Sequence, residues 1–298
     1  MDEHFINMGE IIQSLRVYKG LDIEEVAEDI CSVEELELIE KNKQSPTLDQ
    51  LSELAIKLNV QLSDLFDFVN ADSFNYVSAV NELIKKYKRN RNYQAIYEIV
   101  QREMDNPLYN FPLGKQYLLW HQAICLYYLS DSKDKEKDLA IRRLNEAIEI
   151  TNPKKTSLTE REIEIKMAIA IIEKDSKELE QSIIIFKDIL EEIDTLPSLG
   201  DPRVRLRALF GLAQSLSNLE RYVESLIYCE KGIEHCINDD SLFLLGEFLY
   251  QAALNNVMLG SNEDGKEYLT KSLHIFNLQE NSNLAELVKG QLEKIASQ

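Results

Sequence analysis

Residues 209–232 read LFGLAQSLSNLERYVESLIYCEKG, and residues 249–272, forty positions further along the chain, read LYQAALNNVMLGSNEDGKEYLTKS. Each stretch begins with a helical pattern in which a small residue, Ala213 or Ala253, lies among large apolar ones. After a short turn, a second helical pattern carries small residues at two positions. These small positions are Ser225, Gly232, Gly265 and Ser272. Because small side chains let another helix cross closely, each stretch predicts a tight helical hairpin.

Weaker copies of the same pattern lie upstream and bring the predicted number of hairpins to about five. Their characteristic residues are Ile169, Ala170, Ser182, Phe186 and Ile189; Trp120, Ala123, Ala140, Leu144 and Ala147; and Leu83, Tyr87, Tyr93, Ile96 and Val100. Internal repeats of this length are typical of helical solenoids. A single hairpin cannot bury its apolar face, so the hairpins must stack, and stacking predicts a curved superhelix with a concave inner wall.

Composition and charge narrow the class of protein. Hydrophobic residues make up 44% of the 298, while glycine (10) and proline (6) are scarce, which favours long helices in about two domains. The net charge of −19 predicts no bulk attraction to nucleic acid or to an anionic membrane. Met1 is followed directly by Asp2 and Glu3, without the basic and apolar regions of a signal peptide. No segment has the length of a membrane span, so we expect a cytoplasmic protein without a membrane partner.

Residues 8–68 carry the pattern of five short helices with clear boundaries. Asp22, Ser32 and Thr47 are predicted N-caps, and Gly20 is predicted to end the first helix. The third helix is expected over residues 32–41 and the fourth over residues following Thr47. The closing apolar residues are Leu62, Leu65 and Phe66.

Two local patterns in this chain resemble known modules. The hairpins resemble the tetratricopeptide repeat, although the period here is longer, and residues 8–68 resemble the helix-turn-helix of Xre-type phage-repressor regulators. Their combination resembles the RRNPP group of peptide-sensing regulators, and its PlcR-type members most. Local matches include residues 93–97, 116–120, 186–190, 221–226 and 246–251.

The resemblance implies an all-α fold in which a helix-turn-helix domain precedes an α-solenoid of about five TPR-like hairpins. We expect a DNA-binding domain at residues 1–68, a linker at 69–78, and a peptide-binding and dimerisation domain at 79–298. It also implies a quorum-sensing-type transcription regulator that acts as a homodimer. A short signalling peptide would bind in the concave groove, and operator DNA would bind the helix-turn-helix.

The predicted DNA-reading helix, residues 32–41, is unusual for its task. Residues 1–68 hold five basic and sixteen acidic residues, a formal net charge of −11. Phosphate neutralisation supplies most non-specific affinity for DNA, so this charge makes operator binding doubtful. The alternative is a repeat scaffold, or anti-regulator, whose acidic N-terminal domain binds a protein. The residues expected to contact DNA are Arg16, Ser32, Val33, Glu34, Glu37, Leu38, Lys41 and Lys43.

Aromatic and amide side chains on the first helix of each hairpin suit a peptide ligand, although packing within the hairpin is the more common explanation of a single aromatic residue. Arg89 and Arg91 lie in the most basic stretch and match cationic positions of PlcR-like proteins, but a solvated turn explains them as well. Asparagines that relatives use for the peptide backbone are replaced here by Ile171 and Gly211. The expected peptide contacts are Tyr87, Arg89, Arg91, Trp120, Gln122, Tyr127, Gln214, Tyr250, Gln251 and Asn255.

The sequence offers no enzyme, cofactor or metal motif. It contains no G-x-x-x-x-G-K, H-E-x-x-H or G-x-S-x-G sequence and no CxxC pair. Cys229 and Cys236 are seven residues apart on one predicted helix, roughly 10 Å along its axis, which is too far for a disulfide. We therefore expect reduced core thiols, with thiol sensing as the alternative.

Overall fold

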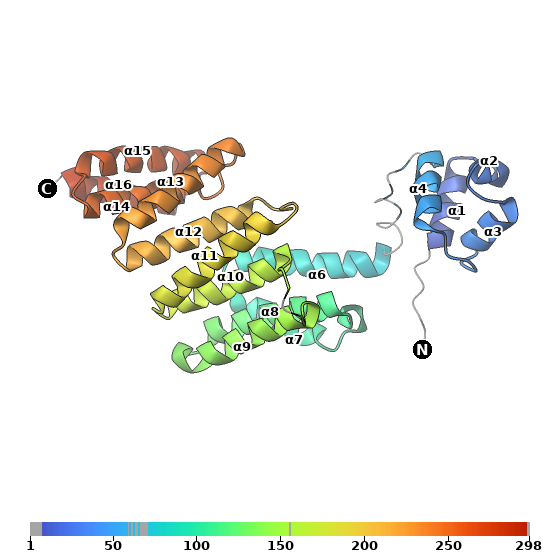
Figure 1. Cartoon of the computed structure of the whole chain (residues 1–298), viewed down its shortest axis with the longest axis horizontal. Coiled ribbons are helices and arrows are strands. Elements are labelled where there is room, and N and C mark those ends of the chain that lie inside the picture. The colour runs from blue at the N-terminus through green and yellow to red at the C-terminus, as the bar shows by residue number, and fades with distance from the viewer. Residues whose placement is uncertain are drawn as a thin grey trace. The chain divides into compact units, whose positions relative to one another are not determined.

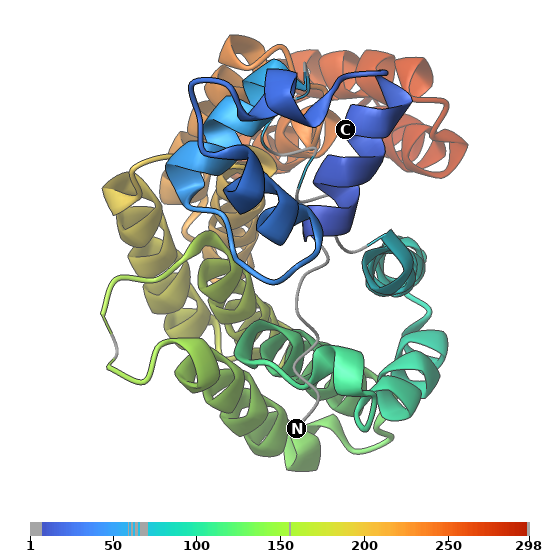
Figure 2. The same ribbon diagram turned by 90° about the vertical axis from the view of Figure 1, so that its right-hand side faces the viewer.

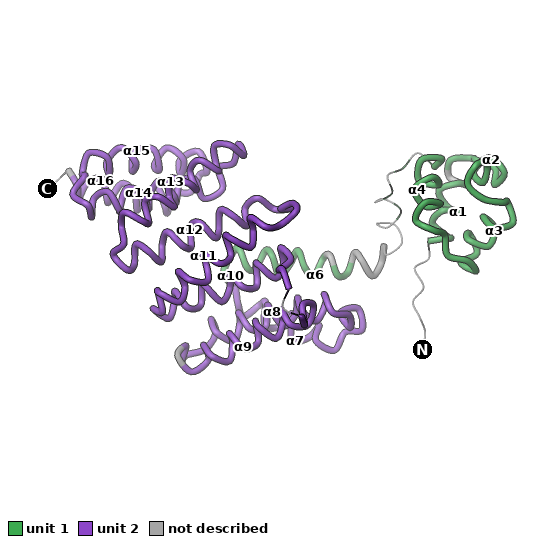
Figure 3. The backbone as a smooth tube through the Cα atoms, viewed as in Figure 1, with its two compact units in different colours: residues 1–91 green, residues 92–298 purple. Residues whose placement is uncertain are grey.

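The structure is a computed structural model that describes residues 8–58, 60, 62, 65, 71–154 and 156–296. All regular secondary structure in these residues is helical, as the sequence predicts (Figure 1). The chain divides into two compact units, residues 1–91 and residues 92–298 (Figure 3). Each unit is described by itself below.

The first unit begins with four short helices, which we call the head (residues 8–58). They are α1 (Met8–Tyr18), α2 (Ile23–Ala27), α3 (Val33–Glu40) and α4 (Leu48–Lys57). The Ser32 hydroxyl accepts from the Glu35 amide at 3.1 Å, and Thr47 forms a reciprocal capping box with Gln50. Gly20 follows α1 with φ +67°, as predicted. These caps fix the helix starts, and fully buried Ile12, Leu36, Ile39, Leu54 and Leu58 hold the helices together.

The last helix of this unit, α6 (Ala71–Arg89), begins inside the segment that the sequence assigns to a linker. Residues 71–89 contain neither glycine nor proline, so nothing in the sequence stops the helix from extending toward its N-terminus. Residues 69, 70 and Phe66 lie outside the described residues. The predicted hairpin nearest the N-terminus, residues 83–100, includes residues of both units.

The second unit is a stack of helical hairpins. It contains α7 (Tyr93–Glu103), a short 3-10 helix η1 (Pro107–Tyr109), α8 (Pro112–Leu129), α9 (Lys133–Thr151), α10 (Glu160–Asp175), α11 (Leu179–Thr195), α12 (Arg203–Asn218), α13 (Tyr222–Asn238), α14 (Leu245–Met258), α15 (Asn262–Leu278) and α16 (Ser282–Ala296). Consecutive helices pack on one another along the stack. Viewed end-on, α8 to α15 follow one another around an arc (Figure 2). This arrangement is the predicted solenoid.

Each hairpin closes on the small residues that the sequence singles out. The Ser225 hydroxyl of α13 donates to the Ala213 carbonyl of α12 at 2.7 Å, and Ser182 of α11 donates to Ala170 of α10 at 2.9 Å. At Gly232, a Cβ would come within 2.3 Å of the Phe248 ring, so only glycine permits α14 to pack here. The predicted role of small residues in close helix approach is therefore confirmed.

The turns inside the α10–α11, α12–α13 and α14–α15 hairpins share one backbone conformation. Lys177, Glu220 and Gly260 occupy equivalent positions between the two helices, with φ of +66°, +61° and +86°. This left-handed region favours glycine, and two of the three turns use another residue. The repeat therefore preserves the turn geometry even where the residue type is unfavourable.

Candidate functional site: the inner wall of the repeats

The first helices of successive hairpins lie on the inside of the arc. We call α8, α10, α12 and α14 the A helices, and α9, α11, α13 and α15 the B helices. Each A helix touches the next one, α8 with α10, α10 with α12 and α12 with α14. In a curved stack, direct contact between every second helix places those helices on the concave side. We call the A-helix faces at these contacts the inner wall.

Between α12 and α14 the inner wall contains a connected set of amide and hydroxyl groups. The Ser217 hydroxyl donates to Asn255 Oδ1 at 2.8 Å, and Gln251 Nε2 donates to Ser217 at 3.0 Å. Asn255 Nδ2 donates to Ser225 at 2.8 Å, which joins the network to the hairpin interior. Asn255 is fully buried, whereas Gln251 and Ser217 are half-buried. Gln251 therefore keeps a partly exposed amide at this junction, and Ser217 and Asn255 orient it.

Between α10 and α12 the contacts are charged. Lys174 Nζ donates to Gln214 Oε1 at 2.8 Å, and Arg207 pairs with Glu164 at 2.7 Å. Gln214 is a predicted peptide contact, whereas the sequence reasoning missed Lys174, Arg207 and Glu164. These partners lie 40 and 43 residues apart, so the only signal for them is the repeat period.

The junction of α8 and α10 is aromatic. The Tyr128 hydroxyl donates to Asp175 Oδ2 at 2.8 Å, and the Tyr127 hydroxyl lies 2.9 Å from Ser176 Oγ. Burial, followed by the charge of Asp175, raises the pKa of Tyr128, so it remains a hydrogen-bond donor at neutral pH. Tyr93 stacks on Tyr128 with ring centroids 4.4 Å apart.

Apolar side chains lie next to these polar contacts. Ile171 lies three residues before Lys174, Phe210 four before Gln214, and Leu254 three after Gln251, so each shares a helix face with its polar neighbour. All three are half-buried. The inner wall therefore offers apolar surface beside fixed hydrogen-bonding groups, which is the combination that a peptide requires.

The residues predicted to contact the peptide differ in how deeply they are buried and in which of the two units they belong to. Gln122, Gln214, Tyr250 and Gln251 are half-buried on A helices, while Trp120, Tyr127 and Asn255 are buried and build the layer behind the surface. Tyr87, Arg89 and Arg91 belong to the first unit and are described with it, Arg91 following α6 with φ +53°. Their assignment as ligand contacts stays a prediction.

Gly211, one of the two positions where the resemblance leads us to expect an asparagine, packs against the preceding helix. A Cβ there would come within 2.2 Å of Phe186 Cζ on α11, so the position serves helix packing. The neighbouring residues Phe210 and Gln214 face inward instead. This difference follows from a rotation of about 100° per residue around a helix axis.

In the head, two of the cations expected at DNA are engaged within the chain. Arg16 donates from Nε and Nη2 to the two carboxylate oxygens of Glu40 at 2.7 and 2.9 Å, and Glu40 is buried. Lys41 pairs with Glu37 at 2.7 Å. The outward face of α3 consists of Glu34, Glu37, Leu38 and the half-buried Val33, while Ser32 serves as its N-cap and Lys43 is exposed. A carboxylate therefore accompanies each cation at this edge except Lys43.

The described residues contain no cluster of three or more His, Cys, Asp or Glu arranged to hold a metal ion. Cys125, Cys229 and Cys236 are buried free thiols, as expected of reduced core cysteines, whereas Cys31 is partly exposed. Within the same part of the chain, none of the helices combines the length and hydropathy of a bilayer span.

Fold and site together define a helical-repeat protein whose inner wall presents hydrogen-bonding and apolar groups. The particular family follows from comparison with known proteins: residues 80–294 match the model of the RNPP family C-terminal domain. The chain thus belongs to the RNPP family of peptide-sensing regulators, as its sequence resemblance predicts. A comparison with curated proteins gives no match.

Solved structures share the fold over nearly the whole chain. PlcR of Bacillus thuringiensis, in complex with the peptide PapR7 and DNA, is 23% identical with a TM-score of 0.79, covering 95% of this chain and 99% of that one. ComR from S. thermophilus, in complex with DNA and its signalling peptide ComS, is 15% identical with a TM-score of 0.60, covering 97% and 99%. The SHP pheromone receptor Rgg2 of Streptococcus dysgalactiae is 13% identical with a TM-score of 0.61, covering 96% and 99%.

Proposed function

We propose that this protein is a cytoplasmic, homodimeric transcription regulator that binds a short signalling peptide on its inner wall. The network of Gln251, Ser217 and Asn255 carries this proposal, because it holds a half-buried amide in a fixed orientation beside the apolar Leu254. Gln214 offers a second amide, oriented by Lys174. Family membership and the peptide-bound state of PlcR and ComR support the same ligand class.

Calorimetric titration with synthetic candidate peptides tests the peptide site. Gln214→Ala and Gln251→Ala should each weaken binding roughly tenfold, the effect of losing about one buried hydrogen bond. Gln181→Ala, on the B helix α11, is the matched control and should leave the affinity unchanged. Equal effects of all three substitutions would place the peptide elsewhere.

We also propose that the head binds operator DNA as a helix-turn-helix, with α3 as the reading helix. The support is its order of short capped helices and the DNA complexes of PlcR and ComR. The residues proposed at the DNA surface are Ser32, Val33, Glu34, Glu37, Leu38, Lys41 and Lys43. Gel shifts against genomic fragments at low salt, with and without peptide, test this; retardation of no fragment in either state would refute it.

The charge of the head favours one alternative, a docking surface for a basic protein. Arg16 is held by Glu40 and Lys41 by Glu37, so the face of α3 presents mainly carboxylates. Replacing Glu34 and Glu37 with glutamine separates the two functions. DNA affinity should rise if α3 lies on DNA, because repulsion of phosphate falls, whereas binding of a basic protein should weaken.

A further inference from the structure

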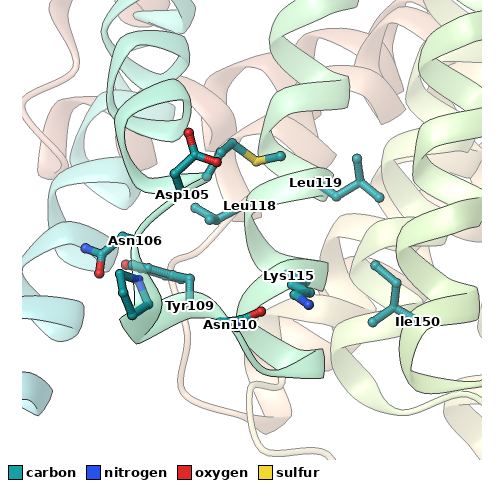
Figure 4. A pocket seen from close by; sticks show the side chains of 10 residues that line it. Asp105, Asn106, Tyr109, Asn110, Lys115, Leu118, Leu119 and Ile150 are labelled. Carbon is teal, nitrogen blue, oxygen red and sulfur yellow. The ribbon is translucent and has the colours of Figure 1, made fainter. Parts of the chain in front are cut away.

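The irregular connection between α7 and α8 forms one wall of a pocket. This connection, residues 104–111, joins one hairpin to the next and includes the 3-10 helix η1. The pocket has a volume of about 490 Å³, within the roughly 300–1,000 Å³ of small-ligand sites (Figure 4). Tyr109 and Leu118, each 2% exposed, form its floor, and Leu119 and Ile150 extend its apolar surface.

This pocket lies away from the inner wall. Leu119 and Tyr128 are nine residues apart on α8, which places their side chains on opposite sides of the helix at about 100° per residue. Tyr128 faces α10, where it bonds Asp175, whereas Leu119 faces the pocket. A ligand here would therefore not compete with one bound on the inner wall.

Two charges of opposite sign border the pocket. They are the Asp105 carboxylate and the Lys115 ammonium, which Leu118 separates in the view of Figure 4. Neither side chain has a hydrogen bond or ion pair with any other described residue. The neighbouring Asn106, by contrast, is used within the chain, donating to Glu103 at 2.6 Å and accepting from the Leu108 amide.

We propose that this pocket binds a short apolar peptide of two or three residues with free ends. Its apolar side chains would cover Tyr109, Leu118 and Ile150, its ammonium would meet Asp105, and its carboxylate would meet Lys115. A peptide carries its ammonium and its carboxylate on different residues, so its two ends can meet groups that lie on different sides of Leu118. The larger hollow of 670 Å³ between α9 and α11 is a weaker candidate, because its Lys166 is already paired with Asp188 and its Glu173 with Lys137.

Calorimetry on the full-length protein with trileucine tests the proposal. The probes are free trileucine, its N-acetylated form and its C-terminal amide. The free form should bind saturably, and blocking either end should weaken binding about two- to fivefold, as expected for a solvent-accessible ion pair.

Variants assign each end of the peptide to its residue. In Lys115→Met, amidation of the peptide should have no further effect, because the residue that pairs with the peptide carboxylate is already gone. In Asp105→Asn, acetylation should likewise have no further effect, because the partner of the peptide ammonium is gone. Lys266→Met and Asp131→Asn are matched exposed controls that should keep the wild-type response.

Three results would overturn this inference: no saturable binding of free trileucine, wild-type sensitivity to both blocking groups in the two pocket variants, or loss of trileucine binding in Gln251→Ala. The last would place the probe on the inner wall. Because the pocket and the inner wall lie on opposite sides of α8, failure here leaves the proposed signalling-peptide site untouched.

Discussion

At the scale of single residues, Arg16 neutralises a carboxylate that is buried beside the core of the head. Its guanidinium binds both oxygens of the buried Glu40 carboxylate and donates to the Leu21 carbonyl at 3.2 Å. Such a pair stabilises little relative to apolar residues, but losing one partner leaves a buried charge without compensation.

Arg16→Met should therefore destabilise the head by about 3 kcal/mol, the usual cost of breaking a buried ion pair. Amide hydrogen exchange of α1 and α3 in the full-length protein measures it. The double variant Arg16→Met with Glu40→Met should recover most of the protection. Unchanged exchange in the single variant would show that Arg16 is free for another role.

The cysteines give a second prediction at this scale. Burial raises the pKa of Cys125 and Cys229 to about 12 and that of Cys236 to about 11. A higher pKa means less thiolate at pH 8, and the thiolate is the species that reacts. Alkylation of the native protein should thus modify the partly exposed Cys31 first.

Mass spectrometry of the alkylated peptides measures the order of reaction. In denaturant, where burial no longer acts, all four thiols should react at similar rates. Native modification of Cys229 as fast as that of Cys31 would contradict the buried environment and revive thiol sensing.

At the scale of helices, the hairpin turns contain a conformational cost. Glu220 holds the left-handed conformation that Gly260 holds in the next hairpin. Glu220→Gly should stabilise the repeats by about 1 kcal/mol, because glycine adopts this region without steric penalty. Gly260→Ala should destabilise by a similar amount, and urea denaturation followed by circular dichroism measures both. A loss of stability in Glu220→Gly would mean that the glutamate side chain has an unrecognised role.

The crossing of α11 and α12 gives a second helix-scale prediction. Gly211→Ala places a Cβ against Phe186, which is fully buried and cannot move aside. Overpacking of this kind should cost about 1–3 kcal/mol. Adding Phe186→Leu makes room and should return part of that loss; a double variant less stable than the sum of the two singles would contradict the contact.

At the scale of the whole molecule, charge limits how the protein meets DNA. The net charge is −19, and within the head Arg16 is held by the buried Glu40, whereas Lys41 forms only an exposed pair with Glu37 that a phosphate can replace. If only Lys41 and Lys43 neutralise phosphates, the salt slope of log affinity should be near −2, at about −0.9 per phosphate. Fluorescence anisotropy over a salt series measures it. A slope of −6 or steeper would require a cationic surface formed by the dimer.

Local chemistry made much of the fold predictable from sequence. The N-caps Ser32 and Thr47 and the turn at Gly20 depend on neighbours within a few residues, and Gly232 on a repeat visible forty residues apart. The residues on the inner face of each A helix are harder to predict. An error of one residue in the alignment turns the helix by about 100° and puts Gly211 in the place of Phe210.

The sequence therefore predicts which types of side chain the candidate site contains, but only some of the contacts between them. Gln214 and Gln251 carry amides on the expected helices, but their partners Lys174 and Ser217 lie on other hairpins. The Arg16–Glu40 pair likewise joins residues 24 positions apart. The helical periodicity of a short segment does not show which residues of distant helices will pair with one another.

The contact of each A helix with the next has a mechanical consequence. In a stack where every hairpin touches only its neighbours, a small change of angle at one junction displaces everything beyond it, and the displacement grows with distance along the stack. The junction of α12 and α14 includes the hydrogen bonds of Ser217, Gln251 and Asn255, so we expect a ligand that exchanges partners there to change the angle at which α15 and α16 follow. Small shifts of these side chains are then expected to become larger movements at the end of the stack.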